Sequence, residues 1–264
     1  MYARRSDPSS ADGQGDWIDD LRVVAAFLTR FPLGRRPEVA PGRLARAGWA
    51  FPVVGAGIGL CGGLVFAVAM WLGLSPWLAA VFAIAAQILA TGALHEDAAA
   101  DVADGFGGGG TREAKLTIMR DSRVGAFGVL ALILLVAGRL AALAAITDPG
   151  AALAALIAAG ALSRTLIVGV MRVLPPARGD GLGAAAGRPD QRGVALAFVL
   201  AMAVAWLALG LGESLVVLVV AALGAGVLAG LAKRQIGGQT GDVLGACQQI
   251  AELLTLTAIA AMAA

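Results

Sequence analysis

The chain has 264 residues, of which 59% are hydrophobic and only 14% charged, and its formal net charge is +2. Its mean hydropathy is +0.82, whereas a soluble globular domain is about half apolar and about a quarter charged. The apolar residues form blocks of roughly 18–25 residues, the length that crosses a bilayer core as a helix, so the composition excludes a soluble domain and predicts a polytopic membrane protein.

The N-terminal residues 1–16 are polar and lack the basic, apolar and small-residue regions of a cleaved signal peptide. We expect them to form a retained, disordered tail. Residues 17–34 place apolar side chains at helical spacing among charges, which is typical of a short amphipathic helix at the membrane surface. We treat residues 17–264 as a single integral membrane domain.

Seven apolar segments predict an all-α bundle of about seven transmembrane helices. To within several residues, the expected spans are 48–72, 76–94, 124–147, 150–171, 194–211, 214–232 and 244–263. Eighteen of the 20 Lys and Arg residues lie before the first span or in the loops after the second, fourth and sixth spans, and the alternate loops carry none. Because basic residues accumulate in cytoplasmic loops, the N-terminus is predicted to be cytoplasmic and the C-terminus to lie across the membrane.

The only histidine and four carboxylates occur in the stretch HEDAAADVADGFGGGG, residues 95–110, where the second span is expected to end. If that span continues as a helix, Asp97, Asp101 and Asp104 share one face, and Glu96 points away from it. Like charges at this spacing repel, and the dipole at a helix C-terminus adds to the penalty, so we expect a cation there. Oxygen ligands favour magnesium, and the absence of a second His or Cys nearby argues against zinc. A solvated acidic helix end is the alternative.

The glycine run 105–110 is expected to end this helix. Gly107 and Gly108 would allow backbone N–H groups to approach phosphate oxygens, although a flexible hinge has the same composition. In residues 111–128, Asp121 is a further candidate metal ligand. Arg120 or Arg123 could hold phosphate by charge-assisted hydrogen bonds, or could serve only as an anchor at the membrane.

Two arginines lie inside predicted spans, where such a residue normally faces a partner or the bundle interior. Arg139 is expected to be either structural or functional, whereas Arg164, which lies deeper, is expected to line a functional pocket. In the last basic loop, GGQTGD (237–242), Thr240 is expected to cap the seventh span with Asp242 near its N-terminus. The glycines around them favour an additional phosphate or metal contact.

The motifs HEDAAADVADGFGGG, IMRDSRVGAFG and GGQTGDVLGA, in this order, resemble those of the cobalamin synthases, the adenosylcobinamide-GDP ribazoletransferases. Further matches are FLTRFP (27–32), FPVVGAGIG (51–59), ALSR (161–164) and ARGDGLG (177–183), so the resemblance covers most of the chain. One departure is Ala98, where the family usually has glycine; alanine favours a helix and leaves the carboxylates unchanged.

The resemblance implies a magnesium-dependent, multi-pass enzyme of the cell inner membrane, with its active-site loops on the cytoplasmic face. It would join adenosylcobinamide-GDP to α-ribazole or its 5′-phosphate, giving adenosylcobalamin or its 5′-phosphate and releasing GMP. Displacement at phosphorus mainly requires positioning and cations, which the acidic and basic motifs could supply.

The expected catalytic residues are Asp97, Asp101, Asp104, Asp121 and Asp242, of which the first three are expected to bind Mg²⁺. The expected substrate contacts are His95, Gly107, Gly108, Ser122, Arg123, Arg164, Arg178 and Thr240. We expect small-molecule substrates and membrane lipid as partners and no nucleic acid, and the sequence leaves a homo-oligomer open.

Two other functions are alternatives. An alcohol phosphatidyltransferase also uses aspartates at a membrane boundary, but its usual motif continues from Asp-Gly into Ala-Arg, whereas Asp104-Gly105 leads into glycines. A transporter with an acidic ion site would place its acids near the midplane in broken helices, whereas these acids are expected at the membrane edge.

Overall fold

The computed structural model describes residues 17–32 and 40–263, and this part of the chain folds into helices without a β-strand. The predicted tail 1–16 lies outside the described residues. The helices are α1 (Trp17–Leu28), α2 (Arg43–Arg46), the 3-10 helix η1 (Ala47–Ala50), α3 (Phe51–Trp71), α4 (Pro76–Thr91), α5 (Leu94–Gly108), α6 (Arg112–Ile118), α7 (Ala126–Ala145), α8 (Pro149–Val173), α9 (Leu182–Ala185), α10 (Gln191–Leu209), α11 (Leu211–Ile236) and α12 (Gly241–Ala263).

Within the described ranges, six helices are long and apolar enough to cross a membrane. They are the run Arg43–Trp71, α7, α8, α10, α11 and α12. The pair α4 and α5 passes the same test together but is bent by 88°, and it makes a seventh span if it is counted as one. The all-α, multi-pass architecture predicted from the apolar segments is confirmed.

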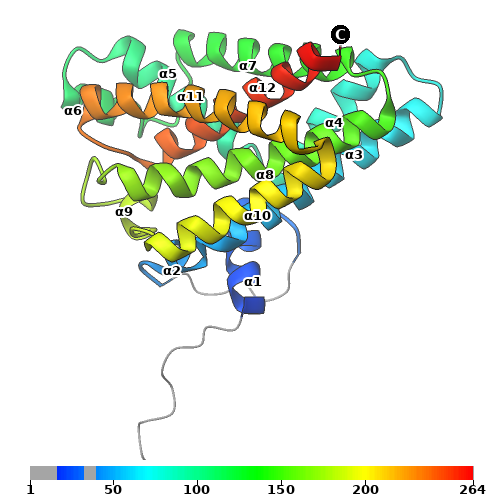
Figure 1. Ribbon diagram of the computed structural model, residues 1–264. Coiled ribbons are helices and arrows are strands. Elements are labelled where there is room, and N and C mark those ends of the chain that lie inside the picture. Colours follow the sequence, from blue (N-terminus) through cyan, green and yellow to red (C-terminus); the bar gives the residue numbers. More distant parts are fainter. Residues whose placement is uncertain (1–16, 33–39, 264) are drawn as a thin grey trace, which may run out of the picture.

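Helix α8 lies at the centre of the bundle, with α3 packed along it (Figure 1). Of its most apolar stretch, 78% is buried inside the protein, compared with 17% for α7 and for α10. Glycines permit this approach, because a Cβ at Gly55 or Gly59 would collide with the backbone of Gly160 or Leu156. This is the small-residue packing that joins helices in a bilayer, where burial of apolar surface adds little.

The outer surface is apolar, as lipid contact requires. Large hydrophobic side chains are exposed on α3, α7, α10 and α11, among them Leu64, Leu134, Leu207 and Val227. On a water-soluble protein such a surface would promote aggregation, whereas in a bilayer it faces acyl chains.

The second predicted span does not continue as one straight helix, which corrects an expectation from the sequence. Gly92 and Ala93 both have positive φ angles, 66° and 58°, and the chain turns between α4 and α5. Glu96 and Asp97 therefore lie in the first turn of α5, at the positive end of its dipole. For Asp97 the dipole is favourable, which is the reverse of the penalty expected from a continuous span.

Helix α1 packs its apolar face against the bundle. Val24 and Leu28 are fully buried, and the Asp20 carboxylate accepts a hydrogen bond from Trp49 Nε1 (2.8 Å) and pairs with Arg43. The short helices α2, α6 and α9 gather at one end of the bundle, at the left of Figure 1. The acidic motif of α5 and the start of α12 lie at this same end.

Candidate active site

Carboxylates from two helices converge where α5 packs against α12. Asp97 and Asp104 of α5 and Asp242 of α12 all exert a repulsive charge interaction on the half-buried Asp101. Asp97 and Asp242 also repel each other. The structure therefore brings the two acidic motifs of the sequence into one site.

Asp104 differs from the other acids because its carboxylate accepts hydrogen bonds from the backbone of α7. Its Oδ2 accepts a hydrogen bond from Gly125 N–H (2.7 Å) and its Oδ1 accepts one from Gly128 N–H (2.8 Å). A Cβ at either glycine would collide with the carboxylate, so both glycines are needed for this approach. Asp104 thus caps α7 from α5, and its negative charge stabilises the N-terminus of α7. Sequence reasoning placed Asp104 among the metal ligands and did not foresee this role.

The loop before α12 places Asp242 beside a basic residue. Thr240 Oγ1 accepts a hydrogen bond from Val243 N–H (3.3 Å), so Thr240 caps α12 as the sequence indicates. It also donates a hydrogen bond to Asp242 Oδ2 (3.1 Å). The Arg178 guanidinium lies 3.8 Å from the same carboxylate, and its Nη1 is buried without a hydrogen-bond partner in the described part of the chain. This arrangement leaves a donor available to an anion next to the acids.

Short backbone contacts hold these two loops together. Ala177 N–H donates to Gln239 O and Gln239 N–H donates to Pro175 O, both at 2.8 Å. The Arg112 side chain joins the loops further by donating to the carbonyl oxygens of Ile236 (2.9 Å) and Ala177. The loop that carries Arg178 is therefore positioned by the loop that carries Asp242.

Asp121 and Arg123 pair with each other in an exposed loop. Arg123 Nη2 donates to Asp121 Oδ2 (2.6 Å), and this hydrogen bond is the main reason that the pKa of Asp121 falls to about 2. The same interaction raises the pKa of Arg123. Sequence reasoning took Asp121 as a metal ligand and Arg123 as a phosphate contact, whereas here each is the partner of the other.

The glycine run ends α5 at Gly108, as the sequence predicts. A Cβ at Gly107 would meet the Phe127 ring at 2.6 Å, so Gly107 is required for packing between α5 and α7. Gly108 and Ser122 are exposed at the same end of the bundle.

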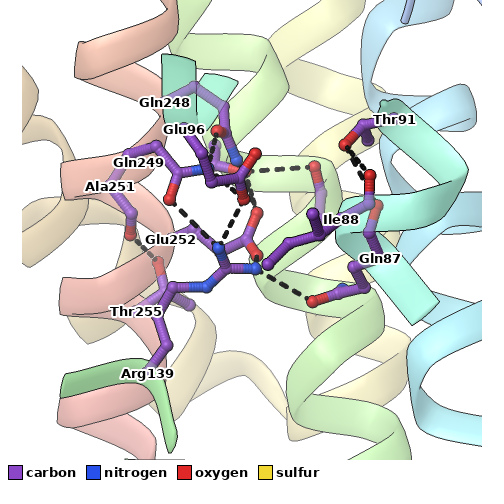
Figure 2. Close-up of polar contacts among 12 residues, drawn as sticks. Gln87, Ile88, Thr91, Glu96, Arg139, Gln248, Gln249, Ala251, Glu252 and Thr255 are labelled. Carbon is purple, nitrogen blue, oxygen red and sulfur yellow. Dashed lines mark hydrogen bonds and ion pairs between the residues drawn. The ribbon is translucent and has the colours of Figure 1, made fainter. Parts of the chain in front are cut away.

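The two intramembrane arginines are joined in one buried ionic network, and Figure 2 shows the contacts around Arg139. Arg139 donates to Glu96 (2.9 Å) and Glu252 (2.6 Å). Gln87 and Gln249 accept from the same guanidinium, at 3.1 and 3.0 Å. The other oxygen of Glu252 pairs with Arg164. Two glutamates thus balance two arginines, and at most 9% of any of these four side chains is exposed.

Sequence reasoning found the arginines of this network and missed the acid that joins them. Glu252 lies in the last span, on the same helix as Gln248 and Gln249. An ionisable side chain within a span calls for a partner, so Glu252 could have been matched with Arg139 and Arg164. Glu96 lies in the acidic motif of the sequence but points away from its shared face, and its carboxylate accepts a hydrogen bond from Arg139 in this network.

A pocket with a cavity volume of about 150 Å³ opens beside Asp97 and Asp242. Its wall is mostly apolar and includes Phe27, Phe51 and Met171. His95 also lines it, is 1% exposed, and has no hydrogen-bond partner at either ring nitrogen within the described residues.

The donor set fits a hard cation only with help from a ligand. Among the described residues, no group of three or more His, Cys, Asp or Glu side chains is placed to hold a metal ion. Magnesium, however, commonly takes only one or two carboxylates and completes its shell with water and substrate phosphates. Mutually repelling carboxylates beside Arg178 are compatible with a site of that type.

Comparison with known proteins bears on this site. A family described as cobalamin-5-phosphate synthase matches residues 20–260. A protein of Bradyrhizobium diazoefficiens named adenosylcobinamide-GDP ribazoletransferase is 52% identical over 244 residues, which are 92% of this chain and 94% of that protein.

Further relatives carry the same name. The protein of Mesorhizobium japonicum is 46% identical over 239 residues, covering 90% of this chain and 92% of the relative. That of Rhizobium etli is 43% identical over 255 residues, covering 93% and 97%. No solved structure matches the chain.

Proposed function

The chain belongs to the cobalamin-5-phosphate synthase family, and we propose from this that it is an adenosylcobinamide-GDP ribazoletransferase. It transfers the phosphate-linked corrinoid of adenosylcobinamide-GDP to α-ribazole, or to α-ribazole 5′-phosphate, and releases GMP. It is a transferase of cobalamin synthesis. Neither an alcohol phosphatidyltransferase nor a transporter is favoured, although the broken pair α4 and α5 is a feature that transporters also use.

The observation that carries the site assignment is the convergence of Asp97, Asp101 and Asp242 beside Arg178. We propose that one or two carboxylates of this cluster, with the substrate's phosphates, hold Mg²⁺. When bound, this ion would neutralise the charge that builds up on the bridging phosphates. Asp104 keeps a free lone pair on each oxygen, but its hydrogen bonds to α7 make it mainly the residue that fixes α5.

The chain's own residues then position the reactants. The Arg178 guanidinium, whose buried Nη1 has no partner among the described residues, would bind a phosphate oxygen of the diphosphate. An acid of this cluster would accept the proton of the attacking ribose hydroxyl as the bond from phosphorus to GMP breaks. Arg123 could reach the GDP portion only by leaving Asp121, so we place it at the periphery of the site.

We also propose that the protein lies in the cell inner membrane with this site on the cytoplasmic side. The support is the distribution of basic residues, which lie in the loops next to α2, α6, α9 and the start of α12. The exposed apolar side chains of the outer surface would contact membrane lipid.

The direct test is turnover by the purified protein in detergent. Supplied with adenosylcobinamide-GDP, α-ribazole and Mg²⁺, it should release GMP and form adenosylcobalamin in equal amounts. Absence of both products under conditions where one of the relatives is active would reject the function.

A further inference from the structure

Next to the acidic cluster is a pocket whose chemistry differs from that of the cluster. Phe27, Phe51, Met171 and Leu182 line it with apolar and aromatic surface, and the acids Asp97 and Asp242 lie on the same wall. The pocket is formed by segments that are far apart in the chain and includes the N-terminal helix α1. It can take a flat apolar group whose polar end reaches the carboxylates.

His95 is the unusual member of this wall. It is buried, and both ring nitrogens lack a partner in the part of the chain that is described. Buried polar groups in proteins are nearly always hydrogen-bonded, so an unpaired imidazole on a cavity wall suggests that a ligand supplies the partner. An acyl chain would leave that nitrogen unpaired.

We propose that this pocket binds the base of the ribazole substrate and that His95 donates a hydrogen bond to the free ring nitrogen of that base. The inference rests on the proposed function. The base is a dimethylbenzimidazole: a planar, fused apolar ring system with one nitrogen bonded to ribose and the other available as an acceptor. With the base in the pocket, its ribose hydroxyls lie toward Asp97 and Asp242, where the diphosphate is placed.

The pocket lies next to the residues proposed to bind phosphate, as a substrate with its base in the pocket and its ribose toward the diphosphate requires. Arg178 pairs with Asp242 from the loop that precedes α9, and Leu182 of α9 lines the pocket. Phosphate binding and base binding would therefore take place on one continuous wall. The guanine of the other substrate carries several donors and acceptors and would find a single imidazole and two repelling acids there, so it is the less suitable occupant.

The test uses two nucleosides that differ in one atom: α-ribazole, and its analogue in which the free ring nitrogen is replaced by C–H. The wild-type protein should prefer α-ribazole by about 10- to 100-fold in kcat/KM, because the analogue leaves the imidazole unpaired. In His95→Leu this preference should fall to within about twofold, with the KM for adenosylcobinamide-GDP unchanged. Equilibrium binding of α-ribazole without the corrinoid should weaken in parallel.

A second variant covers the case in which His95→Leu does not fold. Leu182 is 57% exposed, so Leu182→Trp should fold, narrow the pocket and raise the KM for α-ribazole. Leu207→Trp, at a position 83% exposed on α10, is the matched control and should have no effect. An unchanged nucleoside preference in His95→Leu, or a change only in the KM for adenosylcobinamide-GDP, would overturn the base-pocket assignment. Failure of the wild-type protein to turn over would instead reject the proposed function.

Discussion

Replacing Asp104 with Asn should destabilise the protein, whereas replacing its neighbour Asp101 should not. The Asp104 carboxylate is 8% exposed and accepts two backbone N–H groups at the start of α7. An asparagine has one acceptor oxygen in place of two. Its amide N–H₂ would face the N–H of Gly125 or Gly128, and the negative charge at the helix N-terminus would be lost.

The magnitude follows from these two losses. A hydrogen bond to a charged group contributes about 1.5–3 kcal/mol, and a charge at a helix end contributes about 0.3–1 kcal/mol. The free energy of unfolding should therefore fall by about 2–4 kcal/mol for Asp104→Asn. For a chain of this size this corresponds to roughly 4–16 °C in Tm.

Asp101→Asn is the matched control because it removes one carboxylate from the same helix with the same change in charge. Asp97, Asp104 and Asp242 repel Asp101, so its neutralisation should leave the Tm of the magnesium-free protein unchanged or raise it. Thermal unfolding of both variants in the same detergent, with EDTA present, measures the difference. Equal Tm values for the two variants would refute the assignment of Asp104 as the cap of α7.

Three further predictions concern other parts of the protein. Glu252→Gln removes one of the two negative charges that balance Arg139 and Arg164, so it should lower the free energy of unfolding by about 3–5 kcal/mol. Glu96→Gln should also destabilise the protein, and a wild-type Tm for both variants would contradict the ionic network. Because the folded pKa of Asp121 is below its unfolded value, the stability from its pair with Arg123 is present above pH 4 and lost only as the pH falls toward about 2. The pair therefore stays ionised from pH 5 to 8, so Arg123→Ala should change the KM for adenosylcobinamide-GDP little and equally across that range, and a large rise in this KM would contradict the peripheral placement of Arg123. A reporter fused to the C-terminus should behave as exported, and a cytoplasmic signal would contradict the proposed orientation.

The transmembrane helices were predictable because length and hydropathy determine whether a segment can cross a bilayer. The interruption of the helix at Gly92 and Ala93 was not predictable, because alanine is the strongest helix former and gives no sign of a positive φ. The Arg30 side chain occupies the space where a Cβ at position 92 would lie, so this turn needs glycine there. A continuous helix would place Asp97 near a helix C-terminus, where the dipole is unfavourable, whereas the observed turn places it at the N-terminus of α5, where the dipole is favourable.

The composition of the candidate site was predictable, but its division of roles was not. Asp97, Asp101 and Asp104 share the same residue type and nearly the same face of α5, so spacing alone assigns them one function. Only the placement of α7 shows that Asp104 faces the N–H groups of two glycines. The pairing of Asp242 with Arg178 is likewise set by contacts between distant loops, which no local pattern in the sequence contains.

The central claim is that the cluster of Asp97, Asp101 and Asp242 supplies the carboxylates that bind magnesium and promote phosphoryl transfer. Its most direct test is the rate of GMP release as a function of Mg²⁺ concentration, measured for the wild type and for the Asn variant at each of the three positions. The wild type should be inactive in EDTA and recover fully with Mg²⁺. Each variant should fold, lose at least about 100-fold in rate, and need more Mg²⁺ for what remains. Near-normal turnover by Asp101→Asn at low Mg²⁺ would contradict the claim.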